Sequence, residues 1–118
     1  MAATEAKSIS TPDETTNFDN GKLEVVTLSG VVFGKATFEP GWRWSRSVRP
    51  IAGTDSCQVS HVGYCLSGAM TIFMDDGTTT EITAGQAVAI PPGHDAEVTG
   101  DEACVFVDFG EISEYAKR

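Results

Sequence analysis

The chain has 118 residues, of which 41% are hydrophobic, enough for a single domain with one apolar core. Its 17 acidic residues outnumber 8 basic ones and give a net charge of −9, which argues against binding to a nucleic acid backbone or an anionic membrane. The first residues lack the apolar centre of a secretory signal, and no apolar run is long enough to span a membrane, so we expect a cytoplasmic protein.

The chain opens with a polar segment and continues as a succession of short strands. Residues 1–20 are rich in Ser, Thr and Glu, which predicts a disordered or extended leader. In the remaining domain, residues 21–118, β-branched and aromatic runs are broken by Gly and Pro. Many short strands with frequent turns predict an all-β sandwich or barrel. The expected strands cover residues 22–28, 31–40, 58–66, 69–82 (a hairpin), 86–90, 96–98 and 103–109.

Few other local signals interrupt this pattern. Asp76-Gly77 lies between the two arms of the hairpin and predicts a type I′ turn. The segment 111–118 looks helical, but it is short. Three cysteines without CxxC spacing indicate free thiols, and we expect Cys65 and Cys104 to be small buried hydrophobic residues.

The stretch GQAVAIPPGHDAEV, which begins at Gly85, resembles the second motif of the cupin superfamily of small β-barrels. Pro91 and Gly93 fall in the register of that motif, and Ala96 stands at its histidine position. His94 lies earlier in the chain, about 6.6 Å from that position along an extended strand. The resemblance implies an all-β, cupin-type jelly-roll β-barrel in a single domain, with a short C-terminal helical turn at most.

The first cupin motif is matched less completely. When Gly68 is aligned with its closing glycine, His61 takes the glutamate position, and Asp55 and Cys57 take the two histidine positions. The resemblance covers roughly residues 23–109. Cupins commonly pair their barrels through strand edges, so it also implies a homodimer.

Cupins hold a divalent metal with side chains that point into the barrel, and this chain offers a different set of donors. Cys57 and His61 share one strand face by the two-residue period, and Asp55 joins them if the strand extends that far. The resemblance therefore suggests Asp55, Cys57, His61 and His94 as ligands of zinc or iron. The alternative is a barrel that has lost its metal, in which His61 is hydrogen-bonded inside and His94 is satisfied in its turn. A related hypothesis makes His61 an acid/base group, which needs only a pocket and a partner such as Cys57 or Asp55.

The segment GWRWSRSVRP (41–50) concentrates aromatic and basic side chains. Stacking on the tryptophans and ion pairing with the arginines are ways to bind a small molecule, whereas the alternative is that the tryptophans cover a barrel end or a dimer contact. Val59 and Tyr64, in the strand 58–66, are further candidates. Tyr64 has the opposite parity to His61 and should face away from the barrel interior. The ligand-binding candidates are Trp42, Arg43, Trp44, Arg49, Val59 and Tyr64.

Three functions stay open on this sequence. The first is a binding or sensing module that holds a small molecule in its barrel. The second is a metal-dependent cupin enzyme, such as an oxygenase, isomerase or cyclase. The third is a structural protein whose barrel is filled by its own side chains. No nucleic acid or membrane partner is expected, because the charge is strongly negative.

Overall fold

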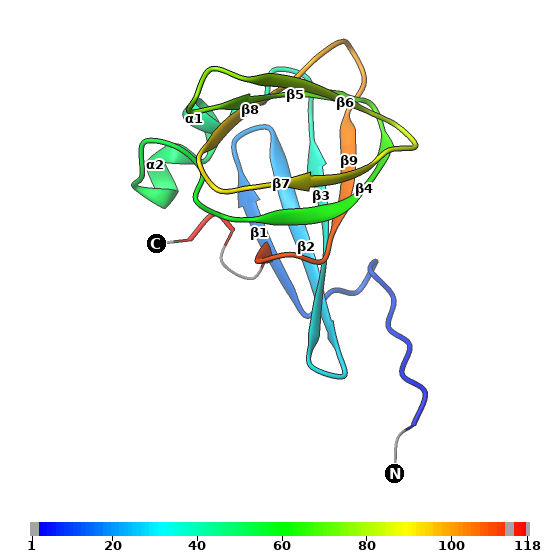
Figure 1. Cartoon of the computed structure of the whole chain (residues 1–118). Coiled ribbons are helices and arrows are strands. Elements are labelled where there is room, and N and C mark those ends of the chain that lie inside the picture. Colours follow the sequence, from blue (N-terminus) through cyan, green and yellow to red (C-terminus); the bar gives the residue numbers. More distant parts are fainter. Residues whose placement is uncertain (1–2, 113–114, 118) are drawn as a thin grey trace.

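The computed structural model describes residues 3–112 and 115–117. In this part of the chain most residues with regular structure lie in strands, which confirms the predicted all-β class (Figure 1). The elements in chain order are β1 (Glu14–Phe18), β2 (Gly21–Leu28), β3 (Val31–Phe38), α1 (Trp44–Ser47), α2 (Arg49–Ala52), β4 (His61–Ser67), β5 (Ala69–Met74), β6 (Thr79–Thr83), β7 (Ala87–Ile90), β8 (His94–Val98) and β9 (Cys104–Asp108).

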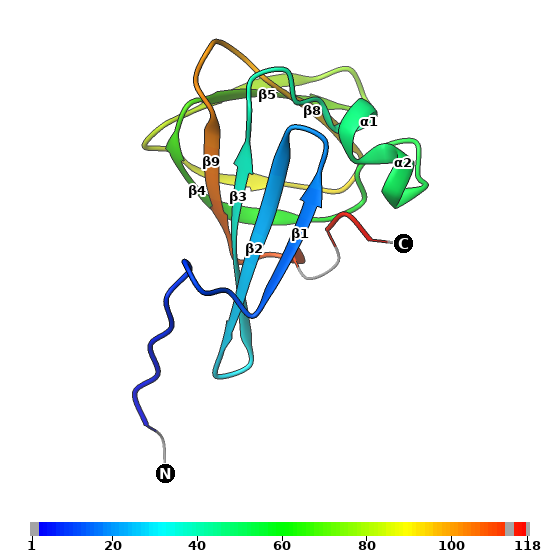
Figure 2. The same ribbon diagram turned by 180° about the vertical axis from the view of Figure 1, so that it is seen from behind.

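The strands form two antiparallel sheets that face each other across the core. The larger sheet has the order β1-β2-β3-β9-β4-β7, and the smaller one has the order β6-β5-β8. Figure 2 shows β1, β2 and β3 side by side, with the β2–β3 hairpin extending beyond the barrel. The chain passes from one sheet to the other and back, so strands that are distant in the sequence, such as β3 and β9, are neighbours in the larger sheet.

Alternating side chains of the strands create the core. On β4, His61 and Cys65 are buried, whereas Val62, Tyr64 and Leu66 are exposed. The buried apolar side chains of β3, β5, β8 and β9 meet them between the two sheets. The core therefore lies inside the barrel, and a residue's parity on its strand decides whether it can reach the interior.

Two segments differ from the sequence-based expectation. Residues 14–18, which fall in the expected leader, form β1, because they add to β2 through a short hairpin in the register Phe18↔Gly21. The segment 41–55, for which the sequence predicted no strand or helix, contains α1 and α2. Pro50 lies in the first turn of α2, where its missing N–H costs nothing, and Gly53 ends that helix with a left-handed φ of 77°. Neither helix is long enough to cross a membrane.

The hairpin at Asp76-Gly77 is present, but its turn type was predicted wrongly. Among these two residues Gly77 alone has a positive φ, 92°, whereas a type I′ turn needs it at both. The Gly77 N–H donates to the carbonyl of Met74 (3.0 Å), and the Asp76 carboxylate accepts the N–H of Thr78 (2.9 Å). This is a type I turn followed by a left-handed glycine. The aspartate side chain stabilises it.

The described residues of the C-terminal segment pack against the core. Residues 113, 114 and 118 of the expected helical turn lie outside the described residues. Ile112, Tyr115 and Ala116 are buried, and Lys117 pairs with Glu14 of β1 (3.0 Å). The tail is thereby packed against the core and tied to the edge of the larger sheet.

Candidate metal centre

Three side chains with metal-binding atoms meet inside the barrel. His61 is the first residue of β4, His94 is the first residue of β8, and Cys57 lies in the segment that leads into β4. One donor atom from each lies within 4.8 Å of the others, and all three residues are buried. Two of these residues are held by the backbone, because the Cys57 N–H donates to the carbonyl of His94 (2.7 Å). The cluster is therefore built into the fold.

Hydrogen bonds fix the tautomer of both imidazoles. His61 Nδ1 lies 2.5 Å from Asp108 Oδ2, and His94 Nδ1 lies 2.9 Å from the carbonyl oxygen of Pro91. Because a carboxylate and a carbonyl can only accept, each Nδ1 must carry the hydrogen. In the neutral rings the lone pair is then on Nε2, and for His61 this nitrogen lies 3.8 Å from Cys57 Sγ. Metal-binding histidines usually have this arrangement, with the second nitrogen fixed by an acceptor.

Asp108 places a negative charge next to the cluster. Its carboxylate is 1% exposed, and its second oxygen accepts the N–H of Gly110 (2.8 Å). A divalent cation bound by the Cys57 thiolate would be balanced by that thiolate together with the Asp108 carboxylate. The local charge thus suits a cation of charge two.

Burial shifts the pKa values of two of the three donors. It lowers the pKa of His94 from 6.5 to about 4, so this ring is neutral and able to coordinate at neutral pH. It also raises the pKa of the Cys57 thiol to about 11. Without a metal, Cys57 therefore carries its proton, and a cation must displace it.

A cavity of about 40 Å³ adjoins the cluster. That volume holds about three water-sized molecules. His61, His94 and Asp108 contribute to its wall, and most of the other lining side chains are apolar. Trp42 and Tyr115 also line it, and the Tyr115 ring lies 5.7 Å from that of His61 in an edge-on arrangement.

Solved structures share the fold of this chain at low sequence identity. The polyketide cyclase RemF from Streptomyces resistomycificus is similar with a TM-score of 0.63 and 18% identity, over 92% of this chain and 79% of that one. An uncharacterised conserved protein with a double-stranded β-helix domain from Klebsiella pneumoniae gives 0.61 and 21%, over 92% and 90%. An oxalate decarboxylase from Lactobacillus farciminis gives 0.58 and 18%, over 83% of this chain but 30% of that one. The chain has the double-stranded β-helix fold of the cupins.

The likeness to these cupins is one of fold. No protein-family model matches the chain, and no curated protein is significantly similar to it in sequence. The chemistry of the site must therefore be argued from its own residues.

Three of the four predicted metal ligands converge inside the barrel, and the fourth does not. The side chain of Asp55 is fully exposed and pairs with Arg49 (3.4 Å), because the backbone leaves the strand direction before Cys57 is reached. Arg49 is likewise exposed, on α2. The structure thus brings neither Asp55 nor Arg49 to the centre.

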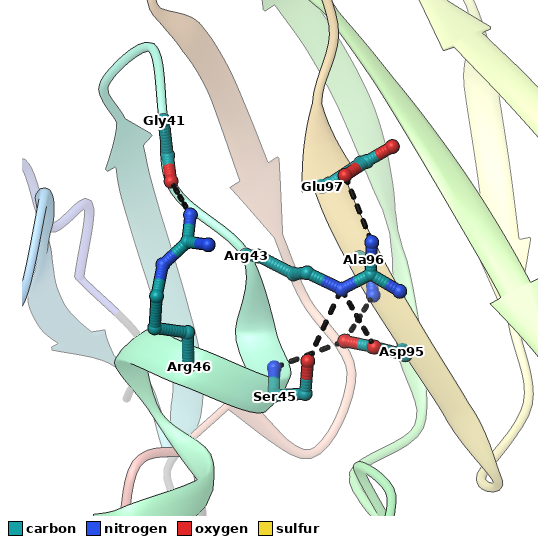
Figure 3. A network of polar contacts seen from close by, with 7 residues as sticks. All are labelled: Gly41, Arg43, Ser45, Arg46, Asp95, Ala96 and Glu97. Atoms are coloured by element: carbon teal, nitrogen blue, oxygen red, sulfur yellow. Dashed lines mark hydrogen bonds and ion pairs between the residues drawn. The ribbon is translucent and has the colours of Figure 1, made fainter.

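Arg43, predicted to bind a ligand, is occupied within the protein instead (Figure 3). Its guanidinium contacts Asp95 Oδ2 (3.2 Å) and Glu97 Oε2 (2.9 Å) on β8, and it lies over the ring of Phe73. The Ser45 N–H donates to the other oxygen of Asp95 (3.0 Å). These contacts fasten the start of α1 to β8.

The remaining ligand-binding candidates divide between inside and outside. Trp42 and Trp44 are 2% exposed and line the cavity. Val59 is half-buried beside a second hollow that also touches Cys57. Tyr64 is 41% exposed on the outer face of β4, as its parity predicts, so its side chain does not reach the cavity.

Two residues of the site were missed in the sequence. Asp108 follows Cys104 and Phe106 at the two-residue period, so an acidic side chain continues the inward face of an apolar strand, and this signal could have identified it. Tyr115 lies in the segment expected to be helical, and nothing in the sequence indicates that it folds back onto His61.

Proposed function

We propose that this protein is a metal-dependent cupin that binds a divalent ion, zinc or iron, through Cys57, His61 and His94 and holds a small organic molecule beside it. The observation that carries the proposal is the convergence of the three donor atoms within 4.8 Å in a buried position. The fixed Nδ1 hydrogens of both histidines support it, because they leave both Nε2 lone pairs available. A thiolate with two imidazoles suits zinc, iron and other first-row ions that accept sulfur and nitrogen.

Three protein ligands leave a coordination position for a substrate or water. A bound divalent ion would supply Lewis-acid polarisation of an oxygen atom placed there. Asp108 would keep the His61 ring in orientation, and the apolar wall of the cavity would limit the access of bulk water. His61 acts in this proposal as a ligand, and its earlier assignment as an acid/base group belongs to the metal-free alternative.

That alternative is a cupin that binds a small molecule without a metal. In it the Cys57 thiol would donate to His61 Nε2, at the observed 3.8 Å, and the apolar cavity would hold the ligand. We prefer the metal-dependent function because it uses all three donors, whereas the alternative gives His94 only its contact with the Pro91 carbonyl.

The metal content of the purified protein tests the proposal. Protein expressed and purified without chelator, then analysed for elements, is expected to contain close to one zinc or iron ion per chain. Cys57→Ser and His94→Gln should lose it. Cys65→Ser is the matched control, since Cys65 is an equally buried thiol that contacts Cys104 (3.9 Å) and not the centre. Metal retained by the Cys57 and His94 variants, or absent from the wild-type protein even after incubation with zinc or iron(II), would contradict the proposal.

We further propose that the protein is a homodimer whose contact is an uncharged face of the larger sheet. The outward side chains of three neighbouring strands, β7, β4 and β9, carry no charge, although 21% of the chain is charged. Two molecules of charge −9 repel each other, and pairing this face brings no like charges into contact. The face consists of Val62, Tyr64, Leu66, Ala87, Ala89, Val105, Val107 and the adjoining Phe109.

A further inference from the structure

The Tyr115 hydroxyl is a buried polar group without a partner. The residue is 3% exposed, and its hydroxyl oxygen makes no hydrogen bond with any part of the chain that the structure describes. Its ring is fixed edge-on between two aromatic neighbours, Phe18 (5.9 Å) and His61 (5.7 Å). The hydroxyl is thus held in place inside the barrel with its hydrogen-bonding capacity unused.

Such a group destabilises the folded protein. A buried hydroxyl without a hydrogen bond loses its contacts with water and gains nothing in return. A phenylalanine at position 115 would keep both ring contacts, so packing does not explain the hydroxyl. An unsatisfied buried group in a cavity wall is expected to have a partner that enters the cavity.

The second unsatisfied donor of the cavity wall indicates what this partner is. The indole N–H of Trp42 is buried and has no acceptor among the described residues. An indole N–H can only donate, and a phenol at neutral pH donates well. The acceptors already present in the wall are used, since Asp108 binds His61 and Gly110. The cavity therefore has free donors and needs a ligand with acceptors.

We infer that Tyr115 is a specificity-determining residue that donates a hydrogen bond to an oxygen atom, carboxylate, enolate or carbonyl, of a small ligand held at the metal centre. The inference rests on the proposed metal-dependent function. The cavity of about 40 Å³ restricts the part of the ligand that enters it to a few non-hydrogen atoms. In the metal-free protein the Asp108 carboxylate would repel an oxygen anion, and a bound cation would offset this repulsion, so the ligand should bind only to the metal-loaded protein.

The test uses cobalt(II) as a spectroscopic substitute for the metal and acetate as the probe. Cobalt(II) is added to the metal-free full-length protein, its affinity is measured from its visible absorption, and the loaded protein is then titrated with acetate. The variant is Tyr115→Phe. The matched control is Tyr64→Phe, which removes the other phenol of the chain, on the outer face of β4. Methylammonium, which offers no acceptor, serves as the negative probe.

Wild-type protein and Tyr64→Phe should bind cobalt and acetate equally well. Tyr115→Phe should keep its cobalt affinity and bind acetate about tenfold or more weakly, the loss expected for a hydrogen bond to a charged oxygen. In the absence of metal and acetate, Tyr115→Phe should also have a higher Tm than the wild type, because an unsatisfied hydroxyl is removed.

The outcomes separate the two proposals. If neither the wild type nor the two variants bind cobalt(II), the metal-dependent function is contradicted, and the inference is contradicted with it. If cobalt binds but acetate affinity is the same in Tyr115→Phe and in the wild type, or acetate does not perturb the cobalt spectrum, the inference alone is overturned. A lower Tm for metal-free Tyr115→Phe would show that the hydroxyl has a structural partner, which also overturns it.

Discussion

Cys57 and His94, far apart in the sequence, face each other as an antiparallel backbone pair joined by hydrogen bonds of 2.7 and 3.3 Å. Two donors of the candidate metal centre are thus placed by main-chain contacts. The pairing also explains how the His94 side chain comes close to Cys57 and His61, although the cupin motif has its histidine at the position of Ala96. His94 and Ala96 both point inward from β8, and Cys57 pairs with His94, the first residue of that strand.

Acid should destabilise the metal-free protein through His94. Its pKa is about 4 in the folded protein and 6.5 in an unfolded chain, so the unfolded state takes up the proton first as the pH falls. The free energy of unfolding is therefore unaffected by this group above pH 6.5. It decreases by about 3 kcal/mol as the pH falls from 6.5 to 4. Urea unfolding of the chelator-treated wild type and His94→Gln at pH 7 and pH 4 measures it. The variant should lose about 3 kcal/mol less than the wild type, and equal losses would contradict the prediction.

Metal binding should release a proton from Cys57. Because the pKa of this thiol is raised to about 11, it is protonated in the metal-free protein at neutral pH. Zinc affinity should therefore rise with pH, about tenfold per unit between pH 7 and 9. Calorimetry at pH 7.5 in two buffers of different ionisation enthalpy should detect about one proton released per ion. A binding enthalpy independent of the buffer would rule out the thiolate as a ligand.

Asp108→Asn should weaken metal binding without removing a ligand. The variant keeps the shape of the side chain but loses the charge, and its amide can present hydrogens to His61 Nδ1. Zinc affinity should fall by about 10- to 100-fold, the usual effect of removing an orienting carboxylate. Asp101→Asn, in an exposed turn, is the control and should bind zinc as the wild type does. An unchanged affinity in Asp108→Asn would show that the carboxylate does not orient His61 for coordination.

Gly63→Ala should severely destabilise the barrel. A Cβ atom at Gly63 would lie 1.9 Å from the backbone carbonyl oxygen of Val107, on the strand that carries Asp108. Since β4 and β9 must separate to admit it, we expect a loss of about 3 kcal/mol or more in the free energy of unfolding. Thr80→Ala, on the exposed part of β6, should change stability little. Comparable urea midpoints for the two variants would show that the strands can separate at no cost.

A single charge on the uncharged face should dissociate the proposed dimer. Leu66 is 50% exposed at this face, and Leu66→Glu would place one carboxylate from each copy in the contact. Light scattering after gel filtration should give twice the mass of the 12.5 kDa chain for the wild type and the monomer mass for the variant. Thr80→Glu adds the same charge on β6, outside the face, and should remain dimeric. A monomeric wild type would contradict the proposal.

The sequence predicted most strands from β2 onward because they are short β-branched or aromatic runs followed closely by Gly or Pro, whereas the polar strand β1 was missed. The two-residue period also placed Cys57 and His61 on one inward face, as observed. Asp55 was misplaced because period-two reasoning holds only while the chain stays extended, and the residues before Cys57 do not form a strand. Long-range contacts, such as the one between Tyr115 and His61, depend on a chain reversal that no local pattern records.

Arg43 links the wall of the cavity to the candidate metal centre. It holds the segment that carries both tryptophans to β8, the strand that begins with His94. Attempts to change the ligand preference by redesigning residues 41–55 should therefore preserve Arg43 with its acidic partners Asp95 and Glu97. Otherwise a change intended to reshape the pocket would also displace His94 from the candidate metal centre.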